Sequence, residues 1–145
     1  MKIAIASDHA GFEQKEALKS YLVELGHEVE DFGPSSDDRV DYPDFAKLVA
    51  EAVSQEKAER GVLVCGTGIG MAIAANKVSG VRAVNIVSPD FAVLSRQHNN
   101  ANVLTVSGRF VELETNKEII QAFLTTDFEG GRHTGRVQKI MDLEQ

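Results

Sequence analysis

Short apolar runs rich in β-branched residues alternate five times with segments of helical period along this chain. Such alternation favours parallel strands joined by right-handed helical crossovers. The runs are nearly continuous in apolar character, as a sheet buried on both faces requires. We therefore expect one doubly wound three-layer α/β/α domain over residues 1–145, with a five-stranded parallel sheet of order 2-1-3-4-5. The predicted strands are Lys2–Ser7, Glu28–Phe32, Val62–Cys65, Arg82–Val87 and Val103–Ser107.

Helix boundaries are marked by a few residues with special backbone preferences. Gly26 stands where a helix C-terminus is expected, and Pro43 where a helix begins. Thr115 and Glu118 have capping-box spacing and predict a helix start. Residues 130–145 break the strand–helix rhythm and predict an extra C-terminal helix, docked on the body of the domain or on a neighbouring molecule.

Composition excludes several classes of protein. Residues 28–59 hold ten acidic and three basic residues, which accounts for the whole net charge of -7 and leaves no basic footprint for nucleic acid. The first residues carry one charge and a brief apolar run, which fits neither a signal peptide nor a membrane span, so we expect a cytoplasmic protein. Cys65 is the only cysteine, and the four histidines lack metal-ligand spacing. We expect no metal and no disulfide.

Two polar segments follow the first and third predicted strands. In open α/β sheets, ligands bind beyond the carboxyl ends of the strands, where the strand order reverses. With the expected order, that point lies between these two strands. Ser7 to Gly11 and Cys65 to Gly70 should therefore line one crevice.

The second of these segments contains three glycines in five positions and precedes a predicted helix over residues 71–78. Without side chains, Gly66, Gly68 and Gly70 would let backbone amides bind an anion or a developing oxyanion; a tight strand-to-helix turn is the alternative. Lys77 comes too late for a phosphate-binding Walker loop. Cys65 is either a core thiol or a base or nucleophile whose thiolate the amide dipoles favour. The Thr67 hydroxyl could cap a helix or bind substrate oxygen.

Two further polar groups lie later in the chain. His98 stands among three asparagines, either in a solvated loop or in a binding site. Arg132 and Arg136 are four residues apart, so on one helix face they could bracket a phosphate, and Arg109 after the fifth strand is a third candidate.

Together, these motifs resemble type B ribose-5-phosphate isomerases of the ribose/galactose-6-phosphate isomerase family. The matching segments cover nearly the whole chain in order: residues 7–11, 41–44, 65–71 with 74–77, 95–104 and 130–136. The resemblance implies an aldose–ketose isomerase without a cofactor. It implies that Cys65 is the base, that His98 helps to open the sugar ring, and that the substrate contacts are Asp8, His9, Gly66, Gly68, Ile69, Gly70, Asn99, Arg109, Arg132 and Arg136. We further expect Thr67 to act at the ring oxygen and His133 to contact the substrate. Tyr42 either closes over the crevice or is a core or surface tyrosine.

The expected reaction interconverts ribose 5-phosphate and ribulose 5-phosphate through an enediol; isomerisation of a six-carbon sugar 6-phosphate of the allose or galactose type is the alternative. A phosphorelay receiver would need a carboxylate and a lysine where Cys65 and Arg109 stand, and a flavin carrier would need aromatic stacking residues that the sequence does not supply. His98 follows the fourth strand, away from Cys65. We therefore expect a homodimer, or a dimer of dimers, with the active site at the interface.

Overall fold

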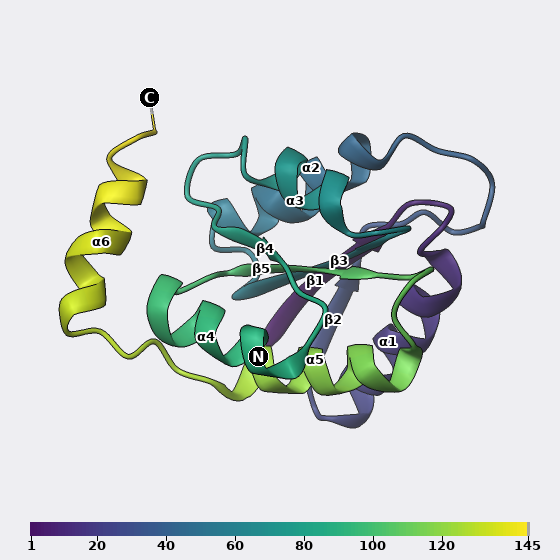
Figure 1. Cartoon of the computed structure of the whole chain (residues 1–145). Coiled ribbons are helices and arrows are strands. Elements are labelled where there is room, and N and C mark those ends of the chain that lie inside the picture. The colour runs from purple at the N-terminus through teal and green to yellow at the C-terminus, as the bar shows by residue number, and fades with distance from the viewer. Residues whose placement is uncertain (145) are drawn as a thin grey trace.

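A computed structural model describes residues 1–144 and shows one parallel sheet covered by helices on both faces (Figure 1). Helices α2 and α3 cover one face, and α1, α4 and α5 cover the other. The predicted three-layer architecture is therefore confirmed. The strands are β1 (Lys2–Ser7), β2 (Glu28–Asp31), β3 (Arg60–Cys65), β4 (Ala83–Asn85) and β5 (Val103–Ser107). The helices are α1 (Phe12–Glu24), α2 (Tyr42–Ser54), α3 (Ile69–Ala75), α4 (Pro89–Asn99), α5 (Leu113–Thr125) and α6 (Arg132–Met141).

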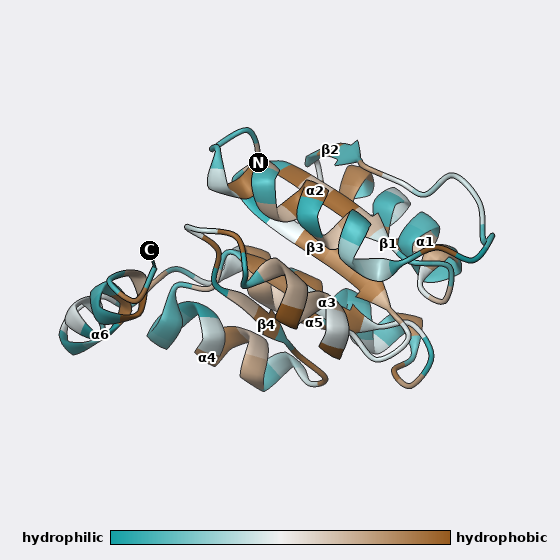
Figure 2. Ribbon diagram, turned by 90° about the horizontal axis from the view of Figure 1, so that it is seen from above, coloured by the Kyte–Doolittle hydropathy of each residue, from teal (hydrophilic) through white to brown (hydrophobic). Residues whose placement is uncertain are grey.

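Two apolar cores flank the sheet because alternate residues of each strand point to opposite faces. In β3, Val62 and Val64 pack toward the α1, α4 and α5 layer, whereas Leu63 and Cys65 pack toward α2 and α3. Burying one such aliphatic side chain contributes about 1.5–3 kcal/mol. Figure 2 shows hydrophobic residues along β3 and a hydrophilic edge strand β2, whose EVED sequence departs from the continuous apolar pattern.

The order of the strands differs from the expected one at a single exchange. The sheet runs β2-β1-β3-β5-β4, so β5 lies beside β3 and β4 forms the edge. All five residues of β5 are buried, which requires a neighbour on both sides, whereas the three-residue β4 is only half buried. Local sequence patterns do not encode which strand pairs with which. The exchange puts Ser107, at the end of β5, directly opposite Cys65.

Two predicted helix starts are also corrected. Helix α5 begins at Leu113, so Thr115 and Glu118 lie inside the helix and form no capping box at its start. Helix α3 runs from Ile69 to Ala75 rather than over residues 71–78, because the glycine loop turns into a helix at once after Gly68. Gly26 follows the last turn of α1 with a φ of 91°, as expected of a residue that ends a helix.

Helix α6 projects from one end of the domain in both overall views (Figures 1 and 2). His133 and Val137 bury their side chains, whereas Ile140 and Leu143 are exposed. The extra C-terminal helix is thus present and only partly docked on its own chain. Within residues 1–144, no helix is both long enough and apolar enough to cross a membrane.

Gly11 allows α1 to approach β3 closely, and its replacement tests this packing. A Cβ atom at Gly11 would collide with the backbone carbonyl of Val64, which cannot move without disrupting the sheet. We expect Gly11→Ala to lower the free energy of unfolding by about 1–3 kcal/mol. Gly135→Ala is the matched control, because nothing lies within 4 Å of its added methyl group and alanine favours the helix by about 0.5–1 kcal/mol. Urea denaturation of both variants checks this, and equal stabilities would contradict it.

Candidate active site

Three chain segments meet where β1, β3 and β5 end. The Asp8 amide donates a hydrogen bond to the carbonyl of Val64 over 3.1 Å, and the Gly108 amide donates to the carbonyl of Cys65 over 2.8 Å. The Arg109 amide donates to the carbonyl of Gly66 over 3.1 Å. These bonds fix the segments to the start of the glycine loop. Asp8, Cys65 and Arg109 therefore lie together at the carboxyl ends of the strands, as the sequence predicted for the first two.

Cys65 ends β3 with its thiol facing the glycine loop. Its side chain is buried, and its Sγ accepts a hydrogen bond from the Gly68 amide over 3.1 Å. Gly68 has a φ of 85°, a left-handed conformation that residues with a Cβ adopt at a cost. The loop therefore folds back on the sulfur and presents it with a backbone N–H donor.

The residues after Cys65 shape the rim of the same loop. The Thr67 Oγ1 accepts the amide of Ile69, the first residue of α3, over 3.1 Å, while Gly68 is the N-cap residue of that helix. Tyr42, the first residue of α2, lies against Gly70, where an added Cβ atom would meet its ring. Tyr42 and Ile69 are both exposed. These positions put Thr67, Ile69, Gly70 and Tyr42 in one neighbourhood with Cys65.

The remaining groups at these strand ends are an acid, a histidine and an arginine. The buried Asp8 accepts the Gly11 amide on Oδ1 over 2.9 Å. The Val40 amide donates to Nδ1 of His9 over 3.3 Å, so a neutral His9 carries its proton on Nε2. The exposed side chain of Arg109 runs beside Gly66. A cation and an N–H donor therefore stand at the strand ends where Cys65 lies.

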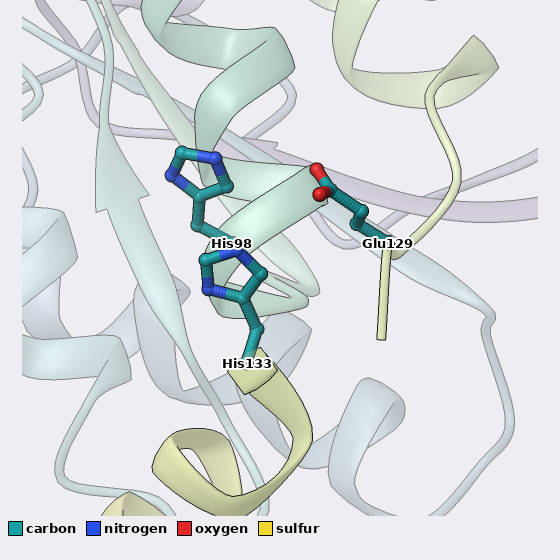
Figure 3. Close-up of side chains that lie close together, drawn as sticks. All are labelled: His98, Glu129 and His133. Carbon is teal, nitrogen blue, oxygen red and sulfur yellow. The ribbon is translucent and has the colours of Figure 1, made fainter. Parts of the chain in front are cut away.

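His98 belongs to a second group of side chains, centred on the start of α6. Its ring stacks on that of His133 with centroids 4.4 Å apart and planes inclined by 14°. Figure 3 shows the carboxylate of Glu129 turned toward the two rings. The Glu129 amide donates to the carbonyl of Gln97 over 3.1 Å, which holds the 129–133 segment against α4. Asn99, Arg132 and Arg136 are exposed nearby on α4 and α6.

The potential metal ligands in this second group were not apparent from sequence spacing. One ring nitrogen of His98, one of His133 and one carboxylate oxygen of Glu129 lie within 4.8 Å of one another. Stacked, nearly parallel rings direct their nitrogen lone pairs side by side, whereas a tetrahedral ion needs them to converge. One ring would have to turn before this group could hold an ion.

The two groups stand at opposite ends of the strands: the Cys65 group at their carboxyl ends and the His98 group at their amino ends. Helix α4 ends just before β5 begins, and Val103 at the start of β5 pairs with Gly61, four residues before Cys65. Four residues of parallel strand span about 13 Å. One chain therefore brings together Asp8, His9, Tyr42, Cys65 to Gly70 and Arg109. It does not bring His98, Asn99, Arg132, His133 or Arg136 to them.

Asn85 and Thr105 support the glycine loop. The sequence patterns did not predict this role. Asn85 Nδ2 donates to the carbonyl of Thr67, and Thr105 Oγ1 donates to the carbonyl of Gly68. Both are polar residues inside otherwise apolar strands. Such interruptions are a signal that could have identified them, because a buried polar side chain needs a partner.

The fold and this site define a class: a three-layer α/β protein with a cysteine–glycine loop at the carboxyl ends of its parallel strands. The family model described as Ribose/Galactose Isomerase matches residues 3–140. Ribose-5-phosphate isomerase B of Escherichia coli K12 is 49% identical over 144 residues, covering 99% of this chain and 97% of the relative. The chain belongs to the ribose/galactose isomerase family, as the motifs predicted.

Solved structures give the same relationship. A ribose 5-phosphate isomerase of Thermotoga maritima superposes with a TM-score of 0.96 at 51% identity, covering 98% of both chains. Ribose-5-phosphate isomerase B of Mycoplasma genitalium, determined with bound ribulose-5-phosphate, has a TM-score of 0.94 at 48% identity, covering 97% of this chain and 94% of that one.

The stack of His98 on His133 should make the docking of α6 depend on pH. Burial lowers the pKa of His133, and His98, Arg132 and Arg136 lower it further, while Glu129 opposes them. Because the folded-state pKa lies below the unfolded value of about 6.5, the unfolded state takes up the proton first as the pH falls. The stabilisation is therefore present above pH about 6.5 and is lost as the pH falls through the folded-state pKa.

Hydrogen exchange of the α6 amides, corrected for intrinsic rates, measures this loss. We expect protection at pH 7.5 that declines at pH 5, while the β3 and β5 amides stay protected. His133→Phe keeps an aromatic ring that cannot titrate, so its α6 protection should change less with pH. Equal pH dependence in the parent and this variant would show that His133 does not control the docking.

Proposed function

We propose that this protein is an aldose–ketose isomerase that interconverts D-ribose 5-phosphate and D-ribulose 5-phosphate through an enediol, without a cofactor. The observation that carries this function is the buried Cys65 thiol, held by the Gly68 amide inside a loop of backbone donors. The E. coli and T. maritima relatives are named ribose-5-phosphate isomerases, and the M. genitalium structure holds ribulose-5-phosphate.

From aldose to ketose, the reaction moves one proton from C2 to C1 and a second from the C2 hydroxyl to the C1 oxygen. It therefore needs a base at the carbons and groups that stabilise the enediolate oxygens. The Cys65 thiolate takes the proton from C2 and returns it to C1. The Gly68 and Ile69 amides already donate within the loop, to Cys65 Sγ and Thr67 Oγ1. The remaining loop amides, those of Gly66, Thr67 and Gly70, are therefore the proposed donors to the enediolate oxygen.

The phosphate and the ring-opening step require cations and a proton shuttle. Arg109 and the Nε2–H of His9 stand at the Cys65 end of the strands, while Asp8 orients sugar hydroxyls. Arg132 and Arg136 are exposed on α6, about 6 Å apart along its axis, and can bracket one phosphate. His98 opens the furanose by proton transfer, with the Thr67 hydroxyl near the ring oxygen.

A second copy of the chain would complete the site. His98 and the α6 arginines lie at the end of the strands opposite Cys65, so a two-fold dimer would have to bring the partner's copies of them over the thiol. The surface near the site is suited to this, because α3 and α4 expose large apolar side chains: Ile69, Ile73 and Phe91 are 55%, 60% and 60% exposed. Exposed apolar patches of this kind are typical of protein interfaces.

Turnover by the parent and by Cys65→Ala tests the function. The purified chain should isomerise ribose 5-phosphate in excess chelator. Removing the thiol should lower kcat by about 10²- to 10⁴-fold and abolish exchange of the C2 proton with solvent deuterium. Cys65→Ser keeps an acceptor for the Gly68 amide but is a far weaker acid, so it should be equally impaired. Near-parent exchange in either variant would exclude Cys65 as the base.

The same assay distinguishes the six-carbon alternative. Allose 6-phosphate and galactose 6-phosphate carry the same phosphate and reacting carbons but one more carbon between them. The proposed function requires a higher kcat/KM for ribose 5-phosphate, and preference for either six-carbon sugar would assign the protein to the alternative substrate class.

The shared site predicts complementation between two inactive chains. Cys65→Ala and His98→Ala chains are unfolded and refolded together, so half of the random dimers are mixed. Each mixed dimer has one intact site of two, and activity should recover to about a quarter of the parent value. A refolded mixture of Cys65→Ala with Cys65→Ser is the control and should recover nothing. Recovery no greater than the sum of the two variants would show that both residues act from one chain.

A further inference from the structure

Asn85, at the end of the edge strand β4, contacts the glycine loop from the side away from the thiol. Its Nδ2 donates to the carbonyl of Thr67 over 3.1 Å and to Oγ1 of Thr105 over 3.1 Å. The Thr105 hydroxyl in turn donates to the carbonyl of Gly68 over 2.7 Å. Two side chains from two strands thus hold the two carbonyls on either side of the Gly68 Cα atom.

The orientation of the Asn85 amide follows from its neighbours. The carbonyl of Thr67 can only accept, so the side-chain oxygen of Asn85 in that place would repel it. The two Nδ2 protons are then used by Thr67 and Thr105, and the single hydroxyl proton of Thr105 by Gly68. Every donor in this small network has a partner.

The geometry of one peptide unit connects Asn85 to the thiol. The Thr67 carbonyl and the Gly68 N–H belong to the same planar trans peptide, so they point in opposite directions. Asn85 holds the carbonyl on the β4 side, and the N–H consequently faces Sγ of Cys65, 3.1 Å away. Asn85 also occupies the space that a side chain at Gly68 would need.

We propose that Asn85, supported by Thr105, is a positioning residue that holds the Thr67–Gly68 peptide so that its N–H stabilises the Cys65 thiolate. This role rests on the isomerase function proposed above, in which that thiolate is the base. Without the clamp, the peptide can rotate and turn its N–H away from the sulfur. The thiolate then loses a charge-assisted hydrogen bond, while the substrate-binding groups stay in place.

The pH profile of kcat/KM tests the clamp, because its rising limb follows ionisation of the base. Asn85→Leu keeps a side chain of similar size but has no donor. We expect the midpoint of the rising limb to move upward by about one pH unit, a tenfold loss of kcat/KM at lower pH that is recovered at high pH. KM should change little. Thr105→Val should move the midpoint in the same direction, and the double variant should move it by less than the sum.

Asn102→Ala is the matched control. Asn102 also joins backbone segments, accepting the Arg82 amide and donating to the Gly80 carbonyl, but it lies directly before β5, at the opposite end of the strand from the loop. Its loss should lower stability without moving the midpoint. An unmoved midpoint in Asn85→Leu, or an equal shift in Asn102→Ala, would overturn the positioning role. If Asn85→Leu does not fold, Asn85→Ala and Thr105→Val provide the same comparison.

A second readout is independent of turnover. Cys65 is the only cysteine of the chain, so its alkylation by iodoacetamide across pH follows the thiolate alone. The alkylation midpoint should shift upward in Asn85→Leu by the same amount as the kinetic one. If the parent does not isomerise ribose 5-phosphate but the alkylation midpoint still shifts in Asn85→Leu, the proposed function is refuted and the positioning role stands. If the alkylation midpoint does not shift, the positioning role is refuted whatever the activity of the parent.

Discussion

The parallel pairing of β3 between β1 and β5 is the constraint on which the rest of the site depends. It buries Cys65 at the end of a strand that has neighbours on both sides, and it leaves the carbonyls of Val64, Cys65 and Gly66 to bind the amides that follow β1 and β5. Gly11 makes this possible, because a side chain there would separate α1 from β3. The glycine loop is thus attached to the central strand of the sheet, which is paired on both sides.

Ion pairs and hydrogen bonds hold the start of the segment that joins β2 to α2. Lys15 is fully buried, yet its Nζ donates to both carboxylate oxygens of Asp31 and to the carbonyl of Pro34. Burial by itself would raise the pKa of Asp31, but Lys19, the Gly33 amide and Lys15 outweigh it and lower that pKa. The segment held in this way leads to Val40, which contacts His9, and to Tyr42, which lies on Gly70. Part of the acidic bias of residues 28–59 is therefore structural.

The second group of residues owes its place to contacts rather than to strand geometry. Arg96 donates to the carbonyl of Thr126 and to Oδ1 of Asn100, which joins the end of α4 to the end of α5. Burial, with Arg60 and Arg82 nearby, lowers the pKa of Arg96 to about 10, so it remains charged at neutral pH. The chain after α5 then runs back along α4 and sets His133 on His98. These contacts place His98, the proposed ring-opening residue, away from the thiol of its own chain.

The sequence by itself determined the features that depend on local pattern and residue chemistry. Lys2–Ser7 and Val103–Ser107 were delimited correctly because apolar β-branched runs end there at polar residues. The Cys65 to Gly70 loop was recognisable because glycines directly after a strand have few other uses. Only the tertiary structure decided the place of β5 beside β3, the stack of His133 on His98 and the contact of Asn85 with the loop. Each joins residues far apart in the chain, and the packing that selects such pairs leaves no local period in the sequence.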